Sequence, residues 1–234
     1  ADIITNLGFV RPLNEEFLNS VNNRAVITGM CEAWEIRSND VNIELCKQKG
    51  IKVAGTWENH PDLKIFDACG HLAVKISQEA GYEVYQNKII VWSNDHFGEV
   101  IGKTFKAFGA KEVITTNEID VLTTYLPDTD FIFFCDYKEQ RQILGKKGII
   151  DINKLINLNI SIGIVHLYGD IDNDEVKKHN LSIYPDKKGL SSIMTYTLAH
   201  LGPAPIINLH AAGLKVGEEM LRNNLTDLTQ IIPS

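Results

Sequence analysis

Three short runs of this chain are apolar at nearly every position, and they limit the fold more than any other feature. Residues 88–93 read KIIVWS, residues 130–136 read DFIFFCD and residues 161–167 read SIGIVHL. A strand that is apolar on both sides has to be covered on both faces, which is typical of a parallel sheet packed between helices. An apolar stripe with helical spacing runs through residues 63–80. The alternation of such strands and helices predicts an α/β protein.

Further candidate strands favour two sheets over one. They lie at residues 1–5, 24–30, 51–56, 112–116 and 181–185, with helical patterns between them. About eight strands are many for one small sheet and suit two Rossmann-like parallel-sheet units. We expect the helix at 63–80 to bridge the units. This predicts a first domain over 1–65, a Rossmann-like nucleotide-binding type of domain over 66–212, and a C-terminal helix over 213–234 that returns to the first domain.

The composition argues against several classes of partner. The 234 residues carry a net charge of −7 and a pI near 5.5, whereas nucleic acids and anionic membranes attract clustered Lys and Arg. No apolar run approaches the ~18–20 residues of a membrane span, and we find no signal peptide. The four cysteines, Cys31, Cys46, Cys69 and Cys135, form no CxxC pair, and no HExxH or HxxxH motif indicates a metal. We therefore expect a cytoplasmic protein with reduced thiols and no metal, nucleic acid or membrane partner.

The segment after the 88–93 strand is where Rossmann proteins hold a dinucleotide. Here it reads Ser93-Asn94-Asp95-His96-Phe97-Gly98. The usual loop has three glycines, for a tight turn, for close approach to the pyrophosphate, and for packing of helix on strand. Only Gly98 is in place, because Ser93 stands at the turn position and Asp95 at the approach position. Either these six residues bind a cofactor, or Asn94 or Asp95 caps the helix; the preference of such side chains for N-caps favours the cap.

Six segments occur in an informative order. They are EIRSNDVNIELCKQKGIKVAGTWENHP (35–61), IFDACGH (65–71), FKAFGAKEV (105–113), DTDFIFF (128–134), GIIDINKL (148–155) and YGDIDNDEV (168–176). Their order resembles the D-isomer-specific 2-hydroxyacid dehydrogenases. The resemblance implies an oxidoreductase-type fold, NAD or NADP as cofactor, and a homodimer formed through the nucleotide domain. It also implies that residues 1–65 form a partial, substrate-type domain, because family members usually have another strand-helix-strand unit before the segment similar to residues 1–5.

The resemblance also shows where this chain departs from the family. The Arg that holds the substrate carboxylate precedes a glycine, but here Tyr168 precedes Gly169, and a tyrosine cannot form a bidentate charged clamp. The acid/base His follows a proline, but here Asp186 follows Pro185, and an ionised Asp is a poor proton donor. Asn117 stands where a carboxylate usually binds the ribose, which an amide can still do. Simple 2-hydroxyacid dehydrogenase activity is therefore not expected.

Polar side chains remain at the ends of two other predicted strands. The loops concerned are residues 30–40 and 56–62. Ligands of open α/β sheets bind at that edge, so we predict Arg37 as the contact for an anionic group and Glu35, Glu58 or His60 as acid or base. The alternative is a solvated loop whose tryptophans pack against a neighbouring domain. His166 could replace the missing histidine, although a histidine on an apolar strand is more often a satisfied core residue.

Two hypotheses about function follow. The first, which the family resemblance favours and which ranks ahead as a description of class, is an NAD(P)-binding oxidoreductase with a remodelled active site. The second, which the chemistry of the loop favours, is a diverged derivative that binds no dinucleotide. Such a derivative would serve as a small-molecule-binding, regulatory or assembly protein. A small-molecule ligand is expected under the first hypothesis and is one of the options under the second.

Overall fold

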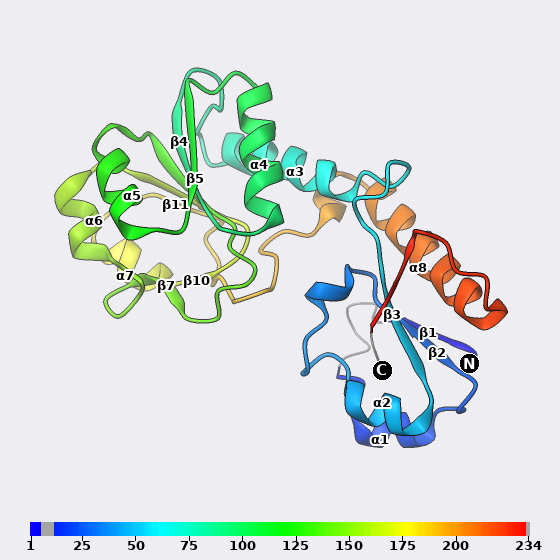
Figure 1. Ribbon diagram of the computed structural model, residues 1–234. Helices are drawn as coiled ribbons and strands as arrows, with labels where there is room; N and C mark the ends of the chain where they lie inside the picture. The colour runs from blue at the N-terminus through cyan, green and yellow to red at the C-terminus, as the bar shows by residue number, and fades with distance from the viewer. Residues whose placement is uncertain (6–11, 233–234) are drawn as a thin grey trace. The chain divides into compact units, whose positions relative to one another are not determined.

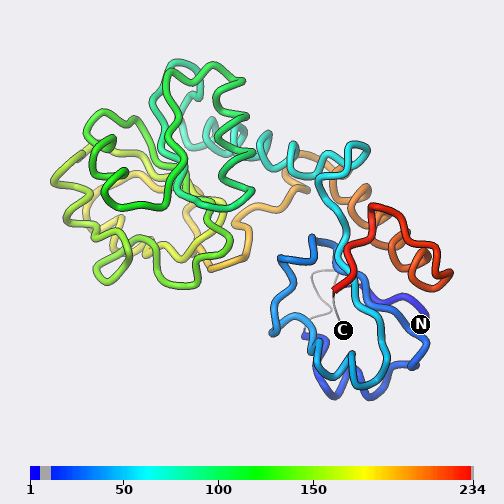
Figure 2. The backbone as a smooth tube through the Cα atoms, viewed as in Figure 1, coloured from blue at the N-terminus to red at the C-terminus, as the bar shows by residue number. Residues whose placement is uncertain are grey.

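The computed structural model describes residues 1–5 and 12–232, and its contacts divide the chain into two compact units. The first unit contains Ala1–Ile65 and Gly202–Ser234, and the second contains Phe66–Leu201. The backbone trace in Figure 2 shows the chain passing from the first unit into the second and back again. The chain therefore returns to the first unit before helix α8 (Ala204–Arg222), whereas the sequence predicted this return between residues 212 and 213. That predicted boundary falls within one continuous helix, which packs on the first unit's strands β1, β2 and β3.

The first unit is built on one four-stranded sheet (Figure 1). The parallel strands are β1 (Ile3–Thr5), β2 (Val26–Thr28) and β3 (Lys52–Thr56), and β12 (Thr229–Ile231) pairs antiparallel with β3. Helices α1 (Glu15–Ser20) and α2 (Ile43–Lys49) pack on one face, where Leu18 and Cys46 meet Ile27 and Val53. Helix α8 covers the other face. The alternation of side chains along short strands thus gives this unit two small cores.

The second unit is a doubly wound parallel sheet. Its strands are β4 (Lys88–Trp92), β5 (Glu112–Thr116), β6 (Phe131–Phe134), β9 (Gly163–His166) and β11 (Ile183–Tyr184), in the order β11-β9-β6-β4-β5. A smaller parallel sheet has the order β10-β7-β8 and consists of β7 (Gln142–Gly145), β8 (Ile150–Asp151) and β10 (Asp170–Ile171). The chain builds outward from β4 to β5 and then returns to β6. The direction of winding therefore reverses between β4 and β6, which is where ligands bind in open α/β sheets.

Helices cover both faces of the main sheet, as the apolar strands predicted. The covering helices are α3 (Ile65–Glu79), α4 (His96–Ala107), α5 (Ile119–Tyr125), α6 (Ile152–Leu158) and α7 (Asn173–Lys178). On one face Phe105 of α4 packs edge-on against Phe131 and Phe133. On the other face Leu122 of α5 and Leu155 of α6 join the core around β4, β6 and β9. The α/β fold with Rossmann-like parallel sheets is confirmed, and within the described ranges no helix is long and apolar enough to cross a membrane.

Candidate functional site

Asp95 caps helix α4, as the sequence favoured. Its backbone is extended, and its buried side chain is 3% exposed. One carboxylate oxygen, Oδ1, accepts hydrogen bonds from the backbone N–H groups of Phe97 (3.0 Å) and Gly98 (3.3 Å) and from the hydroxyl of Ser93 (2.8 Å). These amides have no partner inside the helix, so the carboxylate satisfies them and complements the positive end of the helix dipole.

The second oxygen of the same carboxylate reaches across to the next strand. Asp95 Oδ2 accepts a hydrogen bond of 2.8 Å from the backbone N–H of Tyr137, which follows β6. One side chain therefore joins the carboxyl ends of β4 and β6, at the point where the winding of the sheet reverses. A ligand at this point would use the same amide groups.

Aromatic side chains fill the space beside Asp95. The ring of Phe97 lies 5.7 Å from that of Tyr137 and 4.9 Å from that of Tyr168, and the two tyrosine rings are 5.4 Å apart. All three residues are buried. Tyr168, at the position where the resemblance expects the substrate-binding Arg, is thus part of a packed cluster. Asp186, at the expected His position, forms an ion pair of 2.5 Å with Lys177.

The other residues predicted for the cofactor lie at the same edge of the sheet. Gly98 has the packing role, because a Cβ there would come within 2.6 Å of the Ser93 Cβ. Asn94 is exposed, and the half-buried His96 is 3.2 Å from Glu99 and packs on Phe66. Asn117 directly follows β5, whose last residue pairs with the end of β4.

These residues do not fit a dinucleotide in the arrangement that the structure shows. A pyrophosphate at this loop needs free amides at the helix N-terminus and a backbone without side chains in the way. Asp95 bonds the amides of Phe97 and Gly98, and its own carboxylate would face the phosphates. We therefore derive no chemistry that passes through a nicotinamide at this loop.

The first unit brings the loops after β2 and β3 together. Glu32 accepts hydrogen bonds from the indole of Trp34 (2.7 Å) and from the backbone N–H of Asn59 (3.3 Å), so one carboxylate ties the two loops to each other. Glu35 and Glu58 are buried beside it. Burial raises the pKa of Glu58 well above its usual value, and the charges of Glu35 and Glu32 raise it further. A buried carboxyl with a raised pKa is suited to donate a proton or a hydrogen bond.

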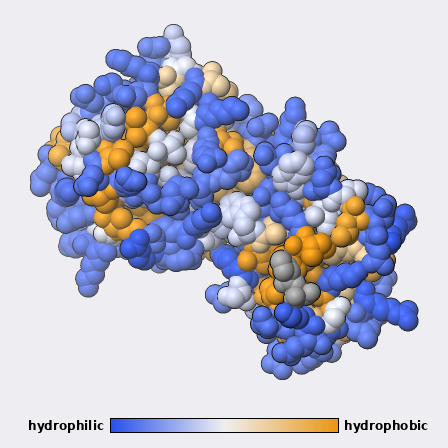
Figure 3. Space-filling view, in the orientation of Figure 1, coloured by the Kyte–Doolittle hydropathy of each residue, from blue (hydrophilic) through white to orange (hydrophobic). Residues whose placement is uncertain are grey.

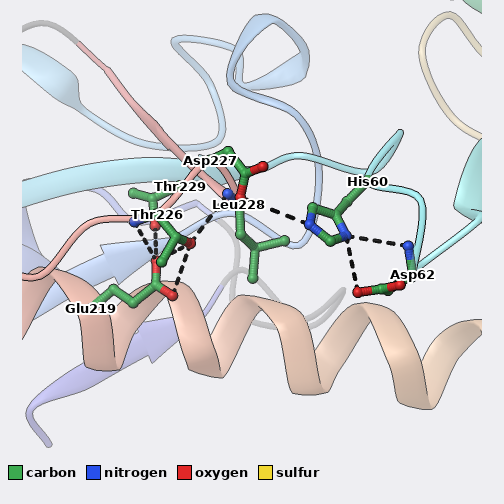
Figure 4. Close-up of polar contacts among 7 residues, drawn as sticks. All are labelled: His60, Asp62, Glu219, Thr226, Asp227, Leu228 and Thr229. Atoms are coloured by element: carbon green, nitrogen blue, oxygen red, sulfur yellow. Dashed lines mark hydrogen bonds and ion pairs between the residues drawn. The ribbon is translucent and has the colours of Figure 1, made fainter.

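His60 lies in the same loop as Glu58, between two carboxylates. Its Nδ1 is 3.9 Å from Asp62 and its Nε2 is 3.8 Å from Asp227 (Figure 4). The backbone N–H of Asp62 donates a hydrogen bond of 3.2 Å to Nδ1, while Nε2 faces Asp227. The ring also packs edge-on against Trp57 at 5.3 Å. This environment orients the imidazole and suits a proton transfer at Nε2.

The sequence did not identify Asp227 or the residues that hold its segment in place. The carboxylate of Glu219, on α8 and 4% exposed, accepts hydrogen bonds from the hydroxyls of Thr226 (2.9 Å) and Thr229 (2.7 Å), as Figure 4 shows. The backbone N–H of Thr226 donates to the same carboxylate (3.2 Å). This buried acceptor fixes the segment that carries Asp227 beside His60. In the sequence, only the pair Thr226 and Thr229, which follows a helix, hints at this arrangement.

Arg37 is engaged within its own loop. Its Nε and Nη2 donate to the two carboxylate oxygens of Asp40, at 3.0 and 3.2 Å. This bidentate pair compensates the charge of the guanidinium locally. The predicted contact of Arg37 with an anionic ligand stays a prediction.

His166 is a core residue of the second unit, in β9, whereas Arg37, Glu58 and His60 belong to the first unit. It is fully buried, and its Nε2 is 3.0 Å from the carbonyl oxygen of Pro185. Burial lowers its pKa to about 4, so the ring is neutral near pH 7. His166 is thus a core histidine, the case that the sequence analysis named as more common, but it is only half satisfied, because its buried Nδ1 has no hydrogen-bond partner among the described residues.

Two further expectations concern metals and thiols. Over residues 1–5 and 12–232, no group of three or more His, Cys, Asp or Glu side chains is arranged to hold a metal ion. None of the four cysteines, all of which lie in the described ranges, forms a disulfide; Cys31 is half-buried and the other three are buried. Burial is the main cause that raises the pKa of Cys135 well above its usual value, which makes this thiol unreactive.

Comparison with known proteins supports the fold. No protein-family model and no curated protein sequence matches the chain. Solved structures do match: a D-lactate dehydrogenase from Treponema pallidum has a TM-score of 0.62 at 13% identity and covers 100% of this chain and 86% of its own. A D-lactate dehydrogenase from Lactobacillus jensenii, solved with NAD+, has a TM-score of 0.63 at 12% identity and covers 100% and 87%. Dipicolinate synthase A chain from Bacillus subtilis has a TM-score of 0.54 at 14% identity and covers 91% and 71%.

These structures define the class of fold. Two of them are D-lactate dehydrogenases, and each covers the whole length of this chain. The likeness in architecture that the sequence predicted is therefore confirmed. At 12–14% identity this likeness shows the fold alone.

Proposed function

We propose that this protein is a derivative of the 2-hydroxyacid dehydrogenase fold that holds no dinucleotide at the loop between β4 and α4. In this proposal it binds a small polar molecule at the loops after β2 and β3. The observation that carries the proposal is the carboxylate of Asp95, which accepts hydrogen bonds from two amides of α4 and from Tyr137. A phosphate would have to displace a buried anion from its own partners before it could bind.

In the first unit, Glu58 and His60 are the residues that we propose to contact the ligand. The raised pKa of Glu58 supports a role as a hydrogen-bond or proton donor. The placement of His60 between Asp62 and Asp227 supports a role in proton transfer at Nε2. Trp34 is 39% exposed and adds an aromatic surface next to these groups.

The test is a thermal-shift comparison of the protein with NAD+, NADH, NADP+ and NADPH. A ligand present at about 100 times its Kd stabilises the native state by ~2.7 kcal/mol, which raises the Tm of a domain of this size by about 5–10 °C. We expect no shift with any of the four nucleotides. A shift of several degrees with NADH or NADPH would show that Asp95 gives way to the cofactor and would overturn the proposal.

Two variants make the test specific. Asp95→Gly removes the carboxylate from the α4 amides, and we expect this variant to gain a nucleotide-dependent shift without gaining turnover. Asp151→Gly is the matched control, because Asp151 caps α6 of the same unit with a hydrogen bond of 2.8 Å to the N–H of Asn153. The control should lose its own helix cap but show no response to nucleotides.

A second candidate function is an NAD(P)-dependent oxidoreductase with a remodelled substrate site. The observation that favours it is the match over the whole chain to a D-lactate dehydrogenase solved with NAD+. Under this alternative the wild-type protein responds to NADH in the thermal-shift assay, and Glu58 and His60 are its acid and base candidates. The two functions therefore predict opposite outcomes in the same experiment.

A further inference from the structure

A cavity of about 400 Å³ opens on the first unit at the beginning of β3. The residues that matter for the argument are Lys47, Ile51, Lys52, Val53, Leu225 and Ile231. The proposed site near His60 follows the end of β3, so this cavity lies at the opposite edge of the sheet. The inference that follows is independent of the function proposed above.

The floor and walls of the cavity are apolar. Ile51 and Val53 are buried and belong to the core that α1 and α2 form with the sheet. Leu225 and Ile231 are large apolar residues that are nonetheless 51% and 43% exposed. Figure 3 shows apolar surface running along the C-terminal segment of this unit. An exposed apolar hollow with polar residues at its rim is typical of a ligand-binding groove.

The rim carries positive charge. Lys52 is held in place because its ammonium group donates a hydrogen bond of 2.6 Å to the side-chain oxygen of Asn223. Lys47 comes from the last turn of α2. No Asp or Glu belongs to the described lining of the cavity, although the chain as a whole has a net charge of −7. The N–H of Gly50 bonds to the carbonyls of Cys46 and Lys47, so these helix-end acceptors already have a donor.

We propose that this cavity binds a free amphipathic monocarboxylate, such as a medium-chain fatty acid. The apolar body lies on Ile51, Val53, Leu225 and Ile231, and the carboxylate lies between the two lysines of the rim. A cavity of this size falls within the ~300–1,000 Å³ of small-molecule sites. A specific protein partner would need an interface of roughly 1,000 Å² or more, which is much larger than this hollow provides.

The test is a titration of the full chain with decanoate, followed by the methyl NMR signals of Ile, Leu and Val. We expect saturable shifts at Ile51, Val53, Leu225 and Ile231. Decanol and decylammonium have the same apolar body with a neutral and a positive head, so both should bind about tenfold or more weakly, since each loses the attraction to two partly exposed cations. Equal binding of the three compounds, or shifts centred elsewhere, would overturn the proposal.

Variants assign the effect to the rim. The double variant Lys47→Gln/Lys52→Gln should raise the Kd for decanoate about tenfold, by the same loss of charge attraction. Lys49→Gln removes a lysine of the same helix that does not line the cavity, so its Kd should stay unchanged. Sedimentation velocity with and without decanoate tests whether a second copy of the chain occupies the cavity instead. A dimer that decanoate dissociates would assign the groove to a second copy of the chain and refute the proposal.

Discussion

The carboxylate of Asp95 should contribute several kcal/mol to the stability of the second unit. Asp95→Ala removes an N-cap, which typically costs about 1–2 kcal/mol. It also removes a buried, charge-assisted bond to the Tyr137 amide, worth about 1.5–3 kcal/mol. The two effects together predict a loss of about 3–4 kcal/mol in the free energy of unfolding.

Asp95→Asn separates these two contributions. An asparagine keeps an oxygen that can accept from Phe97 and Gly98, so the cap survives. Its amide group then faces the N–H of Tyr137, and two donors cannot bond each other. We therefore expect Asn to cost about 1.5–3 kcal/mol, which is less than Ala by the value of the cap.

Trp92 allows the measurement to be made on the second unit alone. The chain has three tryptophans, and Trp34 and Trp57 belong to the first unit. In a Trp34→Phe/Trp57→Phe background, the fluorescence of the buried Trp92 follows urea unfolding of the second unit. The reasoning would be refuted if Asp95→Ala lost less than about 1 kcal/mol. Equal losses for Ala and Asn would show that the contact with Tyr137 carries the whole effect.

Three further changes test the local structure. Thr28→Val should leave the free energy of unfolding in urea unchanged or raise it by up to ~1 kcal/mol, because the buried hydroxyl of Thr28 has no partner in the described chain. Thr56→Val, the control, should lower it by about 1–2 kcal/mol, because it removes a hydrogen bond of 2.8 Å to a backbone carbonyl. The pKa of His166 is lowered to about 4, so the unfolded chain binds a proton first as the pH falls, and ~3 kcal/mol of stability should be lost between about pH 6.5 and 4. The free energy of unfolding of His166→Asn should depend less on pH over this range. Gly55→Ala should prevent folding of the first unit, as judged by circular dichroism and NMR, because its Cβ would lie 2.3 Å from the backbone nitrogen of Ala33.

The main sheet could be predicted because its signal is local. Strands β4 and β6 are apolar at each position that the sheet buries, so burial on both faces follows from the residues themselves. The cap could be predicted for the same reason, since Asp95 and the helix that it caps are adjacent in the sequence.

Contacts between distant segments could not be predicted. Residues 191–201 have a helical pattern, but only Leu198–Leu201 form a short 3-10 helix. The hydroxyls of Ser192 and Thr195 instead bond to the carbonyls of Tyr137 and His166. The pairing of β10 with β7 and the pairing of β12 with β3 depend on similarly distant partners.

The bond from Tyr137 to Asp95 shows why one sequence position could suggest two functions. The sequence presents Asp95 as a substitution in a nucleotide loop, and that alone leaves open whether the side chain turns away. The amide of Tyr137, 42 residues later, settles its direction in this structure because it draws the second oxygen toward β6. Under the function proposed above, the helix N-terminus serves folding in place of ligand binding, since the same amides cannot satisfy both anions at once. Asp95→Gly would free these amides, but Phe97, Tyr137 and Tyr168 would still occupy the adjacent space. For this reason the response of Asp95→Gly should be weak, and it should strengthen when Tyr137→Ala is added.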